Sequence, residues 1–209
     1  MAGYASMIGV TMILGGCQIF FIGLIGQYLA RVFEEVGQAA SQNGDDDTLW
    51  RDTLAKNPGC WMAHHNWAVN LAARGEFEAA GEHYRAGLLL NPDAEAHLGL
   101  GAVLEAQGKA EEALTHYQAA LQLKPDYAEA HYSLGTALGI KGQTDEAISQ
   151  FKEALRLKPD YAKAYHNLGN ALLKKGQTNE AICQFQEAVR VKPDYDLAQK
   201  NLAAALALK

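Results

Sequence analysis

AEAHYSLGTALGIKGQTDEAISQFKEALRLKPDY, residues 128–161, is followed at once by a near copy, AKAYHNLGNALLKKGQTNEAICQFQEAVRVKPDY, residues 162–195. The two segments match position for position, so that Phe151, for example, recurs as Phe185. Self-similarity at a fixed period of 34 residues is the sequence pattern of stacked repeats. It therefore predicts that the chain is built from supersecondary units that bury their apolar faces against one another.

The prolines extend this period over most of the chain. All five occupy the same position of the repeat, with spacings of 34, 33, 34 and 34 residues: Pro58, Pro92, Pro125, Pro159 and Pro193. They divide the chain into four units, 61–93, 94–127, 128–161 and 162–195. Each unit holds two apolar-periodic helices around a glycine turn, because glycine enters the left-handed region at low cost and proline closes a helix. The turn glycines are Gly75, Gly108, Gly142 and Gly176.

Small and aromatic residues recur inside the units at positions that suit packing. Small side chains are expected where the two helices cross, namely Gly101, Gly135 and Gly169 with Ala113, Ala147 and Ala181. Aromatic rings are expected to fill the space between a unit and its neighbour, namely Tyr117, Phe151 and Phe185. A leading helix at 48–57 and a final helix at 196–208 are expected to cover the two ends of the array.

This pattern resembles the tetratricopeptide repeat (TPR) family over residues 61–208, most clearly in units two to four. Unit one departs from it, with Trp67 and Ala68 where the others have Leu-Gly. The resemblance implies a right-handed α-solenoid whose first helices line a concave groove. It also implies that the groove binds an extended peptide or a partner helix.

Their positions within the repeat place twelve candidate binding residues in that groove. They are His65, Asn66, Glu95, Leu98, Glu129, Tyr132, Thr136, Lys163, His166, Asn167, Asn170 and Asn201. Asn66, Asn167 and Asn201 share one phase, and an amide can both donate to and accept from a peptide backbone. This resembles the asparagine ladder of some glycosyltransferase-associated repeats, although Gly99 and Ser133 interrupt it; ordinary surface asparagines are the alternative.

Nothing in the sequence indicates catalysis, a cofactor or a metal. Three histidines, His64, His97 and His131, share a phase where an aromatic side chain normally packs, but they fall in different units and are too far apart to bind one ion. No Ser/His/Asp set, phosphate loop or paired-carboxylate motif occurs. We therefore expect a protein that is not an enzyme.

The charge of the chain bears on the class of partner, and its cysteine content bears on disulfide bonds. The net charge of the 209-residue chain is −6 and no basic block occurs, which argues against nucleic acid. Three cysteines, Cys17, Cys60 and Cys183, lie at unrelated phases and are expected to be free thiols.

The first thirty residues have a different character, because none of them is charged. Residues 7–30, MIGVTMILGGCQIFFIGLIGQYLA, are long enough as a helix to cross a bilayer. Three alternatives fit less well. A cleaved signal peptide begins with basic residues, which this stretch does not have, and a lipoprotein signal would end near Cys17, whereas the apolar run continues past it. A soluble core helix would need a partner helix of equal length and apolar character, which the rest of the chain does not offer. We therefore expect a membrane span. Gly9, Gly16 and Gly23 lie on one face of it, which suits packing against another helix or a second copy; the alternative is that glycine is simply frequent in membrane helices.

Residues 3–36 resemble the last transmembrane helix and juxtamembrane tail of bacterial polyprenyl-phosphate glycosyltransferases, the dolichol-phosphate mannose synthase-like group. The resemblance rests on the GYAS start, the LGG before Gln18, the GQYLAR exit and the FEEV tail. That family's catalytic domain is absent from this sequence. The resemblance implies a bacterial inner-membrane location with the repeats on the cytoplasmic side, a topology supported here only by Arg31. The opposite side is the alternative, because residues 49–58, LWRDTLAKNP, resemble the entry to repeat regions of bacterial multispan membrane proteins, some of which place the repeats outside the cytoplasm.

The sequence as a whole predicts an all-α protein of three parts: a membrane helix with its tail at 1–36, a polar tether at 37–47, and a TPR domain at 48–209. The expected function is a membrane-anchored scaffold for protein or peptide partners. Two alternatives remain: an accessory or truncated part of a membrane glycosyltransferase, and a soluble scaffold whose start is wrongly assigned.

Overall fold

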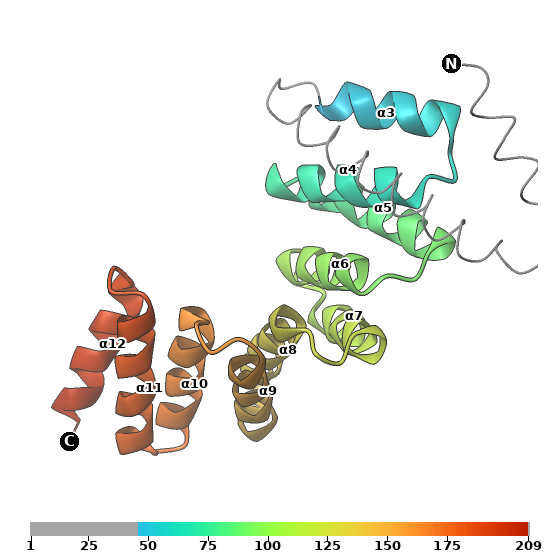
Figure 1. Cartoon of the computed structure of the whole chain (residues 1–209). Coiled ribbons are helices and arrows are strands. Elements are labelled where there is room, and N and C mark those ends of the chain that lie inside the picture. Colours follow the sequence, from blue (N-terminus) through green and yellow to red (C-terminus); the bar gives the residue numbers. More distant parts are fainter. Residues whose placement is uncertain (1–45, 209) are drawn as a thin grey trace, which may run out of the picture.

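The computed structural model describes residues 46–208, which fold into ten α-helices and, within that range, no β-strand. The helices follow one another along an arc (Figure 1). Their bounds are α3 Asp46–Lys56, α4 Trp61–Ala73, α5 Phe77–Leu90, α6 Ala94–Ala106, α7 Ala110–Leu123, α8 Ala128–Ile140, α9 Thr144–Leu157, α10 Ala162–Lys174, α11 Thr178–Val191 and α12 Asp196–Ala207.

The helices form four pairs, α4/α5, α6/α7, α8/α9 and α10/α11, with α3 at the front and α12 at the back. Each helix packs on the next one in the chain, and each pair packs on its neighbour. The first helices of consecutive pairs also contact one another directly, α4 with α6, α6 with α8 and α8 with α10. They therefore lie on the inner, concave side of the arc (Figure 1).

The turns inside the pairs have the conformation expected from their glycines. Gly75, Gly108, Gly142 and Gly176 have φ values of 79°, 78°, 81° and 74°. Residues that carry a side chain rarely adopt this left-handed backbone conformation, whereas glycine does so at little cost and therefore ends each first helix. The second helices end two residues before proline, as α9 ends at Leu157 ahead of Pro159.

The helix crossings are held by a glycine on one helix and an aromatic ring on the other. A Cβ atom added at Gly169 would lie 2.6 Å from Cε1 of Phe185, so the ring rests directly on the backbone of α10. The same arrangement joins Gly135 to Phe151 and Gly101 to Tyr117. The rings thus press on the glycine of their own unit. They also share a core cluster with the next unit, Tyr117 with Leu134 and Phe151 with Leu168, in agreement with the position that the repeat pattern predicts.

The front of the array is closed by α3. Trp50 on α3 is 2 % exposed and packs with Cys60 and Ala63. The carboxylate of Asp47 lies 2.9 Å from the guanidinium of Arg74. Helix α3 begins at Asp46, inside the stretch 37–47 that the sequence assigns to the tether, because aspartates at a helix start favour the N-terminal end of the dipole.

The predicted membrane span at 7–30 and most of the tether lie outside the described residues. Among residues 46–208, no helix combines the length and the apolar character needed to cross a bilayer. Cys60 and Cys183 are free thiols, the first buried and the second exposed.

Candidate functional site

A network of polar side chains joins three neighbouring first helices on the concave side. From α8, the hydroxyls of Tyr132 and Thr136 each accept a hydrogen bond of 3.3 Å from the amide of Asn167 on α10. From α12, the amide of Asn201 donates to Oδ1 of Asn170 on α10 at 2.8 Å. The repeat places these side chains together because they occupy equivalent faces of helices α8, α10 and α12.

His166 lies at the centre of this network and is only 8 % exposed. Its Nε2 lies 3.0 Å from the amide nitrogen of Asn201 and 3.5 Å from that of Asn170, and an amide nitrogen can only donate. Nε2 is therefore the accepting nitrogen, and Nδ1–H donates to Oδ1 of Asn167 at 3.2 Å. Burial lowers the pKa of His166, partly offset by the bond to Asn167, which agrees with a neutral ring.

A hollow of about 140 Å³ opens beside the network, between α8, α9 and α10. Thr136, Asn167 and Asn170 belong both to the hollow and to the network. The remaining lining is mainly apolar, with one cation: Gly139, Ile140, Thr144, Phe151, Ala171 and Lys174. A polar surface thus borders an apolar recess large enough for one side chain.

Six of the twelve candidate groove residues therefore meet in one place: Tyr132, Thr136, His166, Asn167, Asn170 and Asn201. The other six do not join this network. Glu129 pairs with Lys158 at 2.8 Å and Glu95 with Lys124 at 3.6 Å. Lys163 is exposed on α10.

The candidates of units one and two lie on α4 and α6, outside the network. The ring of His65 packs edge-on against Tyr84, with ring centroids 5.7 Å apart, and burial lowers its pKa. Leu98 packs against the apolar core. Asn66 lies on α4, so the ladder of three asparagines reduces here to Asn167 and Asn201, which are joined through His166.

Sequence reasoning missed the hollow and its neighbours. Ile140 and Lys174 lie at the C-terminal ends of their helices, beyond the repeat positions that were assigned to the groove. Ile140 is 69 % exposed, a solvent-facing apolar side chain that a search for unpaired hydrophobic residues could have found. Tyr195, whose hydroxyl lies 3.5 Å from Nδ1 of His166, precedes α12, and its phase indicates only the end of a repeat.

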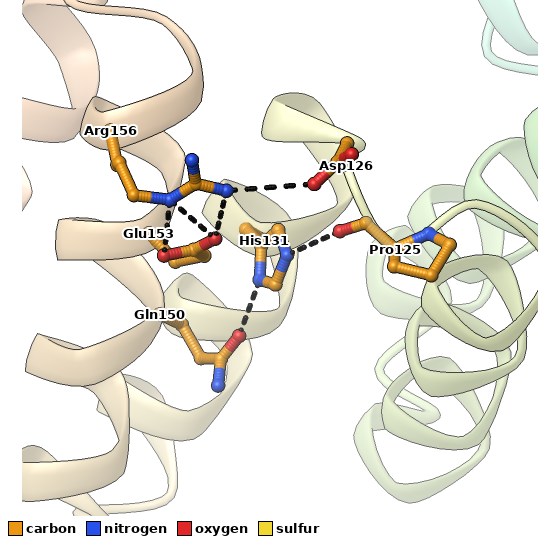
Figure 2. Close-up of polar contacts among 6 residues, drawn as sticks. All are labelled: Pro125, Asp126, His131, Gln150, Glu153 and Arg156. Carbon is orange, nitrogen blue, oxygen red and sulfur yellow. Dashed lines mark hydrogen bonds and ion pairs between the residues drawn. The ribbon is translucent and has the colours of Figure 1, made fainter.

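The remaining histidines tie the two helices of a unit together outside the groove. His131 shows the arrangement most fully: its Nδ1 lies 2.7 Å from Oε1 of Gln150, and its Nε2 lies 2.9 Å from the carbonyl oxygen of Pro125 (Figure 2). In units one and two a second histidine replaces the glutamine. His64 meets His83 there, and His97 meets His116.

The histidine pairs predict that acid destabilises the array. Burial is the main cause that lowers the pKa values of His83 and His116; the neighbouring His64 and His97 lower them further, as does Arg85 for His116, while Glu82 and Glu112 oppose the shift. Because unfolded histidine has a pKa of about 6.5, protonation favours the unfolded chain once the pH falls below that value. Stability is therefore complete above about pH 6.5 and is lost as the pH falls toward the lower folded-state pKa values.

We expect the free energy of unfolding to drop between about pH 7.5 and about pH 5. The drop should be smaller in His83→Gln/His116→Gln, whose units then copy the His131–Gln150 contact. Part of it should remain, because the pKa values of His65 and His166 are also lowered by burial. Urea unfolding followed by circular dichroism at each pH measures this, and equal drops in both proteins would contradict it.

Comparison with known proteins places this architecture among helical repeat scaffolds. A family model described as TPR repeat matches residues 103–139, 140–176 and 169–209, half of the chain. The chain belongs to the TPR repeat family.

Solved structures agree with this assignment. The chain is similar to MamA, with a TM-score of 0.69 and 25% identity, covering 76% of this chain and 95% of that one. It is also similar to YrrB, described as a TPR protein with an unusual peptide-binding site, with a TM-score of 0.67, 21% identity and coverage of 82% and 96%. A thermophilic TPR protein of Thermus thermophilus has a TM-score of 0.64, 24% identity and coverage of 83% and 96%.

A separate, short similarity links the chain to an uncharacterized glycosyltransferase of Synechocystis sp. (strain ATCC 27184 / PCC 6803 / Kazusa). The two are 53% identical over 34 residues, 16% of this chain. The matched segment spans only 11% of the length of that relative.

Proposed function

We propose that the chain is a scaffold that binds an extended segment of a partner protein along α8, α10 and α12. The observation that carries the proposal is the hydrogen-bonded network of Asn167, His166 and Asn201 beside an apolar hollow. Its amides and hydroxyls can exchange their mutual bonds for bonds to a peptide backbone. The bonds of 3.3 Å from Asn167 to Tyr132 and Thr136 are long, so little is lost when a ligand replaces them.

The hollow gives this peptide one point of specificity. A recess of about 140 Å³ walled by Ile140, Phe151 and Ala171 suits one aliphatic side chain of the ligand. Lys174 at its edge, whose Nζ lies 3.5 Å from the carbonyl oxygen of Gly139, favours an acidic residue beside that anchor. Backbone binding by the amides and side-chain binding by the hollow together describe recognition of a short linear segment. The likeness to a solved TPR protein described as having a peptide-binding site supports this. No catalytic role is part of the proposal.

Selection from a displayed library of random peptides tests the site. We expect selected peptides to share one aliphatic position, and Asn167→Ala to weaken binding about tenfold, the effect of one lost hydrogen bond to a ligand. Ile140→Glu should weaken it as well, because it places a charge at the mouth of the hollow without disturbing the core. The exposed Gln186 on α11 supplies the control, Gln186→Ala. Selected peptides that bind all four proteins equally would contradict the site.

The finer proposal is that residues 7–30 anchor the scaffold in a bacterial inner membrane, with the repeats on the cytoplasmic side. It rests on the uncharged length of that stretch and on the resemblance of residues 3–36 to a transmembrane helix. Gly9, Gly16 and Gly23 then offer a face for helix–helix contact, including contact with a second copy. Release of the full chain by carbonate extraction of membranes would contradict the anchor.

A second candidate function is that of an accessory or truncated part of a membrane glycosyltransferase. The observation that favours it is the 34-residue similarity to a Synechocystis glycosyltransferase. The DNA upstream of Met1 tests it. An in-frame catalytic domain there would support this candidate, and unrelated upstream sequence would favour the independent scaffold.

A further inference from the structure

Two histidine pairs in consecutive units have the same geometry. The Nδ1 atoms of His64 on α4 and His83 on α5 are 2.9 Å apart, and those of His97 on α6 and His116 on α7 are also 2.9 Å apart. The ring centroids are 5.1 Å apart in both pairs, with interplanar angles of 37° and 33°. The two pairs therefore repeat one arrangement in which the same imidazole nitrogen of each ring faces its partner.

The backbone holds one ring of the first pair in the tautomer that binds metals. Nε2 of His64 lies 3.3 Å from the carbonyl oxygen of Pro58, and a carbonyl only accepts. The proton of His64 therefore sits on Nε2, and the lone pair of its Nδ1 points at His83. Histidines that bind metals commonly donate their other ring N–H to a backbone carbonyl in this way.

The distance between the two nitrogens fits a shared metal ion. With metal–nitrogen bonds of about 2.1 Å, two nitrogens at right angles around an ion lie about 3.0 Å apart, and at the tetrahedral angle about 3.4 Å apart. The observed 2.9 Å is close to the right-angled value. Square-planar and tetragonal sites with nitrogen ligands favour Cu²⁺ and Ni²⁺ over Zn²⁺.

The surroundings leave both pairs partly accessible and restrain one ring of the first pair. All four rings are half-buried. Trp67 stacks on His83 with ring centroids 4.2 Å apart, which limits the motion of that ring. Nearby carboxylates, Glu82 for the first pair and Glu112 for the second, favour a bound cation, and Arg85 near His116 opposes it.

We propose that each pair is a two-histidine site for a divalent transition-metal ion of the Ni²⁺ or Cu²⁺ class, bound through the two Nδ1 atoms. Binding of the ion moves the single proton that the two nitrogens share onto Nε2 of His83 or His116, and both Nδ1 lone pairs are then free for the ion. Within residues 46–208 no group of three or more His, Cys, Asp or Glu side chains is arranged for a metal ion, so water fills the other positions. The bound ion joins the two helices of a unit, and the site does not depend on the groove.

Unit three supplies the matched control. His131 keeps the same bond to the backbone, with its Nε2 2.9 Å from the oxygen of Pro125, but its Nδ1 faces the side chain of Gln150 at 2.7 Å (Figure 2). Arg156 also lies in this cluster, bonded to Glu153 at 2.7–3.0 Å and 3.5 Å from Asp126. The helix contact is thus compatible with glutamine, and one substitution converts either kind of unit into the other.

Equilibrium dialysis of the full chain against Ni²⁺ at neutral pH tests the proposal. We expect His83→Gln and His116→Gln each to lose one bound ion per chain relative to the parent, and the double variant to lose two. Gln150→His should gain one, since it creates a third pair. Equal Ni²⁺ uptake by the parent and a folded double variant would overturn the proposal. If the double variant does not fold, Gln150→His decides instead: a gain of one ion supports the geometry, and no gain overturns it.

Discussion

Replacing Phe185 with alanine should lower the free energy of unfolding by about 3–5 kcal/mol, the usual cost of removing a fully buried aromatic ring. Phe185 is 0 % exposed and rests on the backbone of Gly169, where it fills the crossing of α10 and α11. It also supports the ring of His166, with centroids 5.9 Å apart. The loss should concentrate in the C-terminal units, because each unit of a repeat array contacts only its neighbours.

Urea unfolding followed by circular dichroism measures this effect. Gln186→Ala is the matched control, since it changes the adjacent but exposed residue of the same helix, and it should alter stability by no more than about 0.5 kcal/mol. A cost for Phe185→Ala that is no larger than the control would show that the crossing carries little of the stability. A second readout is peptide binding, which should weaken because His166 loses its support.

The repeat made the fold predictable because its packing is local and periodic. The left-handed glycines, such as Gly142, follow from the need to end one helix and begin the next within three residues. The sequence shows that Gly135 and Phe151 recur at fixed positions of the repeat, but it did not predict that the ring rests on this glycine. Which face of the ring meets which helix did not follow, because a period of 34 residues does not specify the rotation of one helix against another.

The candidate site was predictable in part, for a similar reason. Phase counting brought Tyr132, Asn167 and Asn201 to one face, but it could not show that their amides bond to one another around His166. It also could not show the hollow, which depends on the ends of α8 and α10 and on their separation. Properties of this kind belong to three helices at once, and no single unit of the sequence carries them.

The histidine pairs are a contact that the sequence did not predict. The sequence shows that His64, His97 and His131 occupy the same position in three different units, and from this it predicts that they do not bind one ion together. The partner of each ring lies 19 residues further on, on the second helix of the same unit. That pairing becomes visible only when the two helices are placed side by side.

Replacing Gly101 with valine should lower the free energy of unfolding by about 3 kcal/mol, at the upper end of the cost of overpacking a core. A Cβ atom at this position would lie 2.5 Å from Cε1 of Tyr117, which is 1 % exposed. The ring cannot swing away freely, because its hydroxyl donates to Oε2 of Glu105 at 2.7 Å. Gly101→Ala should cost less, since alanine gains up to about 1 kcal/mol over glycine inside a helix. Unit one supports this order, because Ala68 holds the equivalent position in the same core as Tyr84.

Two further variants separate the steric conflict from a general effect of replacing glycine in a helix. At Gly139 a Cβ atom would meet only Ala147, at an ordinary 3.8 Å, so Gly139→Ala should raise stability by about 0.5–1 kcal/mol. Combining Gly101→Val with Tyr117→Leu should cost less than the sum of the two single changes, because removal of the ring relieves the clash that valine creates. Additive costs would mean that the glycine is required by the backbone alone, and the contact between glycine and ring would then not explain why this position stays small along the array.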